Sequence, residues 1–288
     1  MKILDVSTSK DQGCKYLITT ENLLESVEST FFLYGEEKKP YLCISSQFGC
    51  AVGCIFCETG KQKSMGDLGE DQIIQQVTLC LDDARRRYHL HEFDTVLFAG
   101  MGEPMLNMKQ VCRASTRIKA EGLAKRVTLT TVGISNKFNE LNQTSFDALS
   151  ISLHATTDEV RKFLIPVSSQ CNIEELVVRA RDYHKKRNAK IYFNYLLLDG
   201  VNDTDSDLKR LCSMFNGDSF VIKLKYLNKV ESSNGVYLNP SNRFELFKDT
   251  LKSRGIECVI DQSIGVDVLG GCGQLRSKSR VMRRMSRH

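Results

Sequence analysis

The chain contains the stretch Gly49-Cys50-Ala51-Val52-Gly53-Cys54-Ile55-Phe56-Cys57-Glu58-Thr59-Gly60, in which three cysteines fall within eight residues. Three thiolates spaced as C-x3-C-x2-C can hold three corners of a [4Fe–4S] cube and leave one iron open to a substrate. Structural zinc usually takes four Cys or His ligands, and no histidine follows Cys57 within thirty residues. The spacing therefore favours an iron–sulfur cluster, with zinc as the weaker alternative.

Strand-like apolar runs alternate with amphipathic segments around this stretch. The expected strands are Tyr41–Ser46, Thr95–Ala99, Val127–Thr131, Ala148–Leu153, Lys190–Leu198 and Phe220–Tyr226. The expected helices are Asp71–Tyr88, Lys109–Ala120, Ile173–His184, Asp205–Phe215 and Arg243–Ser253. Six β-α units in succession predict a parallel sheet, either doubly wound or curled into a barrel. In barrels the chemistry gathers at the C-terminal ends of the strands, where the tripod falls.

Composition sets the broad class of protein. The 288 residues are 41% hydrophobic and 26% charged, a balance typical of a soluble globular chain. We find no signal-peptide h-region and no run of 18 apolar residues, so neither export nor a membrane is expected. Eleven cysteines in such a chain indicate a reducing, cytoplasmic location and argue against disulfides. Cys80 falls on the apolar face of the first expected helix and is interpreted as a core residue.

The net charge of +5 comes from the last thirteen residues. Without residues 276–288, 34 Lys and Arg face 35 Asp and Glu. Basic ends are often arms that meet phosphate backbones, although a frayed, solubilising end is an alternative. The cations of this tail are Arg276, Lys278, Arg280, Arg283, Arg284 and Arg287.

Two further motifs follow expected strands. Gly100-Met101-Gly102-Glu103-Pro104 is not a dinucleotide fingerprint, because Met105 stands where the third glycine belongs. Such a turn is expected to expose one carboxylate, which suits the ammonium group of a ligand. In Ser152-Leu153-His154-Ala155 the histidine is as often a capping or packing residue as a functional one.

A third motif, Gly270-Gly271-Cys272-Gly273, lies just before the basic tail. Its thiol is flanked by glycines and should be accessible, and accessible thiolates are nucleophiles. Taken alone, a surface thiol near a loose terminus is the simpler interpretation.

Together these motifs resemble the RlmN/Cfr family of radical S-adenosylmethionine RNA methyltransferases, from about Leu17 to Leu275. Cys43 and Cys272 in their contexts are more specific than the tripod, which marks the wider superfamily. The resemblance implies an α/β fold, a partial (β/α)6 TIM-like barrel with a short N-terminal extension and a basic C-terminal tail. The implied divisions are an extension packed on the barrel (1–40), the core (41–255), a segment with a methyl-accepting cysteine (256–275) and the tail (276–288).

The resemblance also implies roles for single residues. Cys50, Cys54 and Cys57 would hold a [4Fe–4S] cluster whose open iron binds S-adenosylmethionine. Further contacts to that cofactor would come from Gly102, Glu103, Thr130, Ser152, Leu153, His154 and Asn228. Cys272 would take a methyl group from one S-adenosylmethionine, and a second, making two per turnover, would supply the radical that activates it. The methylene would add to carbon 2 of an adenine, in preference to carbon 8.

The resemblance assigns two more residues and two partners. Cys43 would resolve the resulting protein–adenine crosslink, and Glu28 would accept a proton. The adenine would belong to ribosomal or transfer RNA held by the basic tail. An external donor such as flavodoxin or ferredoxin would supply electrons.

Departures from the family pattern leave the substrate open. The family's N-terminal helical RNA-binding domain has no counterpart, and Ser263–Asp267 lacks the arginine that usually precedes a Gly-Asp pair. A second hypothesis is therefore the same paired-cysteine chemistry on a small molecule, free nucleotide or peptide. A third, a cluster-bearing sensor without enzymatic activity, would not need both Cys43 and Cys272.

Overall fold

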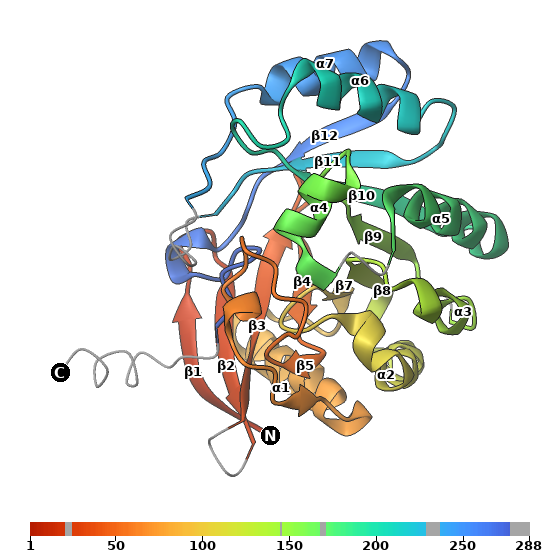
Figure 1. Ribbon diagram of the computed structural model, residues 1–288. Helices are drawn as coiled ribbons and strands as arrows, with labels where there is room; N and C mark the ends of the chain where they lie inside the picture. The colour runs from red at the N-terminus through yellow and green to blue at the C-terminus, as the bar shows by residue number, and fades with distance from the viewer. Residues whose placement is uncertain (21–24, 145, 168–170, 229–236, 277–288) are drawn as a thin grey trace.

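A computed structural model describes residues 1–20, 25–144, 146–167, 171–228 and 237–276. Within these ranges one ten-stranded sheet has the order β1-β2-β3-β4-β7-β8-β9-β10-β11-β12, and a small ribbon pairs β5 (Gln47–Phe48) with β6 (Gly66–Asp67) (Figure 1). From β4 to β12 neighbouring strands are parallel. The strands of the large sheet are β1 (Lys2–Thr8), β2 (Cys14–Thr19), β3 (Ser26–Tyr34), β4 (Lys39–Ile44), β7 (Phe93–Phe98), β8 (Ala124–Thr131), β9 (Ala148–Ser152), β10 (Lys190–Leu196), β11 (Val221–Lys225) and β12 (Glu257–Asp261).

Helices connect the successive parallel strands, and most of them lie along the outer side of the sheet (Figure 1). They are α1 (Glu70–Tyr88), α2 (Met108–Ala120), α3 (Phe138–Leu141), α4 (Asp158–Leu164), α5 (Ile173–Arg187), α6 (Asp205–Met214) and α7 (Phe244–Ser253). Side-chain caps start several of them, as where Asn172 accepts a hydrogen bond from the Glu175 amide at 2.8 Å. The expected α/β class with a parallel sheet is confirmed, and each expected strand and helix has a counterpart within a few residues. Cys80 is buried on α1, as expected.

The parallel strands have one apolar and one polar face, because side chains alternate along a strand. The face toward the helices consists of fully buried apolar side chains, Leu42, Ile44, Val96, Phe98, Val127, Leu129, Leu149, Ile151, Ile191, Phe193, Ile222 and Leu224. The inner face is more polar and mostly half-buried, with Tyr41, Cys43, Thr128, Thr130, Ser150, Ser152, Asn194, Lys223 and Lys225. Helix packing thus stabilises one face, while the other is left to line a site.

The N-terminal residues extend this sheet. Strands β1, β2 and β3 form an antiparallel meander that joins the parallel part where Thr30 of β3 pairs with Cys43 of β4. At the opposite edge β12 adds a parallel strand beyond the six that the sequence predicts. The Tyr34 hydroxyl on β3 donates to Asp261 on β12 at 3.3 Å, so side chains from distant strands meet across the inner face. The barrel form and the divisions at residues 40, 255 and 275 stay predictions.

The C-terminal segment 262–276 lies beside the N-terminal strands, blue next to red in Figure 1. The Ser9 hydroxyl donates to Asp267 at 2.6 Å, and the Thr30 hydroxyl donates to the carbonyl of Gly270 at 3.2 Å. The backbone amide of Arg276 donates to the Glu28 carboxylate at 2.9 Å. The two ends of the described chain therefore hold each other in place.

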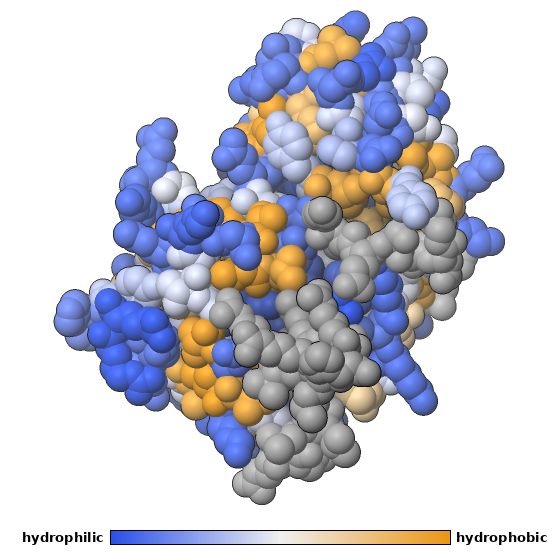
Figure 2. All heavy atoms as spheres, turned by 90° about the vertical axis from the view of Figure 1, so that its left-hand side faces the viewer, coloured by the Kyte–Doolittle hydropathy of each residue, from blue (hydrophilic) through white to orange (hydrophobic). Residues whose placement is uncertain are grey.

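The surface carries separate hydrophobic areas among hydrophilic side chains on the face drawn in Figure 2. In the part of the chain that the structure describes, no helix combines the length and apolar character needed to cross a membrane. All eleven cysteines lie in that part, and each is a free thiol.

Candidate functional site

The three cysteines of the tripod lie on a loop that follows β5. The amide of Cys57 donates to the carbonyl of Cys54 at 3.1 Å, and the amide of Ile55 donates to the carbonyl of Leu164 at the end of α4, at 3.2 Å. Gly60 packs against this loop so closely that a Cβ atom there would lie 2.8 Å from the carbonyl oxygen of Cys54. The loop is thus fastened from both sides.

The environment of the three thiols opposes their deprotonation unless a cation is bound. Burial raises the pKa of Cys50 to about 12 and the pKa of Cys54 well above its ordinary value, and Cys57 is raised in the same way. The charges of Cys57, Cys50 and Glu103 raise the pKa of Cys54 further. Thiolates crowded in this way need cations to compensate them, and metal binding releases their protons.

The donor set fits a cluster with one open iron. Among the described residues, no three His, Cys, Asp or Glu side chains converge to hold a single metal ion. A cube distributes three thiolates over three irons, so it does not require such convergence. Three thiols without a fourth protein ligand leave one corner for another molecule.

The turn after β7 is packed against β5. Gly102 has φ 97°, and a Cβ atom there would lie 2.6 Å from Cβ of Gln47, so this position requires glycine. The side-chain oxygen of Gln47 accepts a hydrogen bond from the amide of Glu103 at 2.8 Å. Gly102 therefore lets the turn approach β5 and directs Glu103 inward.

The carboxylate of Glu103 is buried, which corrects the expectation that the turn exposes it. It accepts hydrogen bonds from the amides of Met105 and Val132, both at 2.9 Å, and from the Thr131 hydroxyl. Burial raises the pKa of Glu103, and these hydrogen bonds oppose that shift. The sequence could not show that the last residue of the next strand, β8, and the residue after it supply two donors that make burial tolerable.

The end of β9 is held by a buried guanidinium. Arg161 of α4 donates to the carbonyls of Ser152 and Leu153 at 3.2 and 3.3 Å, and to those of Cys171 and Val132. Its four carbonyl partners tie the C-terminal ends of β8 and β9 to α4. The same end of β8 carries Thr130 on its half-buried inner face.

His154 is a neutral packing residue in this structure. Its Nδ1 accepts the Leu196 amide at 2.9 Å, and its ring meets Phe56 of the cysteine loop edge to face at 5.0 Å between centroids. Burial lowers the pKa of His154 to about 3, and the charges of Arg161 and Lys225 lower it further. Its backbone is left-handed, with φ 55°.

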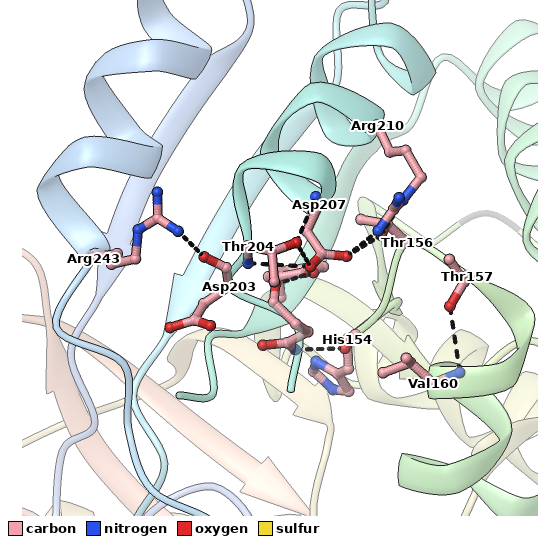
Figure 3. A network of polar contacts seen from close by, with 11 residues as sticks. His154, Thr156, Thr157, Val160, Asp203, Thr204, Asp207, Arg210 and Arg243 are labelled. Carbon is pink, nitrogen blue, oxygen red and sulfur yellow. Dashed lines mark hydrogen bonds and ion pairs between the residues drawn. The ribbon is translucent and has the colours of Figure 1, made fainter. Parts of the chain in front are cut away.

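Helix α6 anchors the loop that follows His154 (Figure 3). The side-chain amide of Asn202 donates to the carbonyl of His154 at 2.8 Å. Thr156 donates to Asp207 and accepts a hydrogen bond from Arg210 at 2.8 Å, while Arg210 also pairs with Asp207 at 2.6 Å. The network makes this end of the strands rigid.

Cys272 is exposed, and its segment lies directly on the residues that follow the tripod. The Glu58 amide donates to the carbonyl of Gly273 at 2.7 Å, and the Thr59 hydroxyl donates to that of Leu275 at 2.6 Å. Asn228, beyond β11, donates to the carbonyl of Cys272 at 2.8 Å. The main chain of Cys272 is therefore fixed, while its thiol is left accessible.

The segment of Cys272 lies beside the residues that neighbour Cys57 and Cys43. Glu58, next to Cys57, donates to the carbonyl of Gly273, and Thr30, which pairs with Cys43, donates to that of Gly270. The charge of Cys272 raises the pKa of both thiols. Cys43 lies on the inner face of β4, where burial raises its pKa to about 12. The structure thus brings the two non-cluster cysteines beside the tripod.

Glu28 is buried on β3, and its carboxylate contacts two donor groups. Its carboxylate pairs with Lys15 at 3.0 Å and accepts the Arg276 amide at 2.9 Å. In this arrangement it fastens the C-terminal segment, and its role as proton acceptor stays a prediction. Lys15 was not among the predicted site residues; its signal in the sequence is a lysine within the short apolar run Cys14–Ile18.

Arg276 belongs to the docked segment, although the sequence placed it in the tail. Its guanidinium pairs with Glu58 at 3.4 Å. The other five cations of the tail lie outside the described residues, namely Lys278, Arg280, Arg283, Arg284 and Arg287.

A partly buried ion pair on the inner face of the sheet was also not predicted. Lys225 of β11 contacts Asp261 of β12 at 2.5 Å, and the Tyr34 hydroxyl donates to the same carboxylate at 3.3 Å. Its signal in the sequence is that lysines, Lys223 and Lys225, alternate with apolar residues along Val221–Lys225. Lysine is rarely buried unless paired.

Comparisons with known proteins agree with this geometry. The model of the Radical SAM superfamily matches residues 44–212. The dual-specificity RNA methyltransferase RlmN of Campylobacter hominis is 35% identical over 247 residues, which cover 84% of this chain and 68% of the relative. RlmN of Campylobacter fetus subsp. fetus is 33% identical, over 95% of this chain and 81% of the relative.

A solved structure is similar over nearly the whole chain. The crystal structure of a radical SAM methyltransferase from Sphaerobacter thermophilus superposes with a TM-score of 0.87 and 30% identity, over 96% of this chain and 81% of that one. The sequence relatives, the superfamily match and this structure agree. The chain therefore belongs to the RlmN family of the radical SAM superfamily.

Proposed function

We propose that this enzyme methylates a ring carbon of an adenine in ribosomal or transfer RNA, carbon 2 in preference to carbon 8, through Cys272. The relatives named above are RNA methyltransferases by name. The observation that carries the proposal is the position of Cys272, whose thiol is exposed and whose main chain is fixed against the residues that follow the tripod and against Thr30, the strand partner of Cys43.

Cys50, Cys54 and Cys57 would hold the [4Fe–4S] cluster that the superfamily implies, and Glu103 would face the amino group of S-adenosylmethionine at the open iron. Together these two groups supply a carbon-centred radical. Gly102, Thr130, Ser152, Leu153, His154 and Asn228 are proposed to surround the cofactor. The rigid ends of β8 and β9 support such positioning.

Cys272 would first act as a nucleophile. Its thiolate attacks the methyl carbon of a sulfonium, so that an S–C bond forms as the sulfonium C–S bond breaks and a neutral thioether leaves. Radical activation of the S-methyl group, at the expense of a second S-adenosylmethionine, then joins its carbon to the adenine. The ring adduct would then return one electron to the redox system that supplied it, and the ring hydrogen would leave as a proton, for which Glu28 is the proposed acceptor.

Cys43 would release the product. Its thiolate attacks the sulfur of Cys272, forming an S–S bond, and the electron pair of the broken S–C bond leaves with the carbon, which takes a proton to become a methyl group. An external thiol reductant reopens the disulfide. Covalent relay of this kind divides one difficult step into easier ones.

The RNA would be held electrostatically. The tail cations Lys278, Arg280, Arg283, Arg284 and Arg287 would release counterions from phosphates, which makes binding weaken as salt rises. Electrons would come from an external flavodoxin or ferredoxin.

The test uses S-adenosylmethionine with a fully deuterated methyl group and the anaerobically reconstituted enzyme. We expect methyladenine in RNA with two deuterons and one solvent hydrogen in its methyl group, and none with Cys272→Ala. A product that keeps three deuterons would overturn the relay. Methylation of free adenine nucleotides but not of RNA would contradict the proposal that RNA is the substrate.

A further inference from the structure

Glu58 directly follows the last cysteine of the tripod and carries a largely buried carboxylate. One oxygen of this carboxylate contacts the ammonium of Lys61 at 2.7 Å, and the other contacts the guanidinium of Arg276 at 3.4 Å. Lys61 lies three residues further along the cysteine loop, whereas Arg276 ends the described part of the segment that carries Cys272. The carboxylate therefore joins the loop to the reactive segment.

Hydrogen bonds from the cysteine loop hold this segment by its main-chain carbonyls. The Glu58 amide donates to the carbonyl of Gly273 at 2.7 Å, and the Thr59 hydroxyl donates to that of Leu275 at 2.6 Å. Every residue of a chain offers such a carbonyl. These bonds therefore attach the segment to the loop but do not determine which of its residues lies opposite which donor.

Arg276 supplies contacts that depend on its own position. Its guanidinium contacts Glu58, its amide donates to the carboxylate of Glu28 at 2.9 Å, and its carbonyl accepts a hydrogen bond from the side chain of Gln62. A shift of the segment by one residue would bring other carbonyls to the same donors but would take the guanidinium away from Glu58. Because the two side chains are only 19% and 8% exposed, little water would compensate the separated charges.

The register of the segment matters because Cys272 lies four residues before Arg276. A shift of an extended segment by one residue moves each side chain by about 3.3 Å. Reacting atoms must come within about 3–3.5 Å of each other, and a misplacement of about 1 Å can slow a reaction about a hundredfold. A shifted segment would thus carry the thiol out of reach of the methyl group that it attacks.

We infer that Glu58 is a positioning residue, whose ion pair with Arg276 sets the register of the C-terminal segment on the cysteine loop and so places Cys272 for methyl transfer. Lys61 contacts the same carboxylate from within the loop and keeps it in place. This inference rests on the proposed function for the use of Cys272. Docking of the segment can be measured without turnover, so failure of the relay and failure of this inference are distinguishable.

The test measures hydrogen–deuterium exchange, by mass spectrometry, in the peptide that covers residues 270–276 of the full-length, cluster-reconstituted protein without substrate. We expect Glu58→Gln and Arg276→Gln each to speed this exchange about fivefold, because each removes the same largely buried ion pair. Arg276→Lys should keep most of the protection. The matched control Lys61→Gln removes the cation from the other carboxylate oxygen and should change the exchange rate less than about twofold.

Methylation of Cys272 by S-adenosylmethionine in the absence of RNA is the second readout. In Glu58→Gln its rate should fall severalfold while iron content stays the same, because the thiol is less often in place. The double variant Glu58→Gln/Arg276→Gln should resemble either single variant, since both substitutions remove one shared contact.

Unchanged exchange in Glu58→Gln would overturn the inference, as would an equal change in Lys61→Gln or additive effects in the double variant. Faster exchange with an unchanged rate of Cys272 methylation would contradict the positioning role. If Glu58→Gln does not fold or loses its iron, Arg276→Gln and Arg276→Lys are compared instead, and equal exchange in that pair would contradict the role of charge. The expected exchange in a protein whose Cys272 is never methylated would reject the proposed function and leave the register role of the pair standing.

Discussion

The cysteine loop and the C-terminal segment hold their thiols in opposite ways. The loop surrounds Cys50, Cys54 and Cys57 closely, and burial raises the pKa of each. The segment fixes the main chain of Cys272 through Asn228 and through neighbouring carbonyls, while the thiol is exposed. Side chains that must hold a metal group are immobilised, whereas a thiol that must exchange bonds with several molecules is fixed at its backbone.

The largest expected effect separates these two regions. Cys54→Ala should lose iron, sulfide and RNA methylation together, because two thiols cannot hold the cube. Cys272→Ala should lose methylation to the same background level but keep its iron and sulfide. Iron assays and methyl incorporation on the same preparations check this. Loss of the cluster in Cys272→Ala would show that the two regions are not separate.

The next effect compares two glycines with positive φ. Gly102→Ala meets Gln47 at 2.6 Å with φ 97°, so strain and overpacking should cost about 3 kcal/mol or more. Gly35→Ala, at φ 73° between β3 and β4, meets nothing within 4 Å and should cost only about 1–2 kcal/mol. Thermal and urea unfolding measure both. Equal losses would mean that the turn at Gly102 can shift away from β5.

Acidification probes the rigid end of β9. Folding lowers the pKa of His154 from 6.5 to about 3. As the pH falls from about 6.5 toward 3, the imidazole therefore takes up a proton in the unfolded chain but not in the folded one, and the folded state loses stability. Between pH 7.5 and 5 this amounts to about 2 kcal/mol. His154→Asn removes the titrating ring and keeps a residue that tolerates the left-handed backbone. In this variant the contribution of His154 to the change of stability with pH should vanish. A slope equal to that of the wild type would contradict a buried neutral imidazole.

The smallest effect concerns the contact between the chain ends. Asp267→Ala removes the bonds from Ser9 and the Lys10 amide, and should lower methylation severalfold with iron content unchanged, because the segment that carries Cys272 then docks less firmly on the N-terminal strands. The control Glu257→Ala breaks an exposed 3.9 Å ion pair with Lys190 and should have little effect. Equal rates in the two variants would show that docking of the segment is not needed.

The parallel core could be predicted from sequence because its signals are local. Alternation along Tyr41–Ile44 or Leu149–Ser152 shows which side chains face the helices, and the tripod spacing is contained in eight residues. The antiparallel strands β2 and β3 were missed because Lys15 and Glu28 interrupt their apolar patterns. Each charge is buried only because the other pairs with it at 3.0 Å, which no local pattern reveals.

The candidate site was predictable in part for the same reason. Cysteines and glycines mark the cluster loop and Cys272 directly, whereas the contact between Lys225 and Asp261 depends on strand register. Burial of Glu103 likewise depends on donors from Thr131, the last residue of the neighbouring strand, and from Val132, which follows it. Contacts between residues on different strands can be identified only once the fold is known.

The central claim is that Cys272 carries the methyl group before RNA receives it. Peptide mass spectrometry of protein purified without oxygen, incubated with S-adenosylmethionine and reductant but no RNA, tests this directly. We predict that the Cys272 peptide gains one methylene, that the Cys43 peptide does not, and that added RNA removes the gain. RNA that becomes methylated while the Cys272 peptide never changes mass would contradict the account.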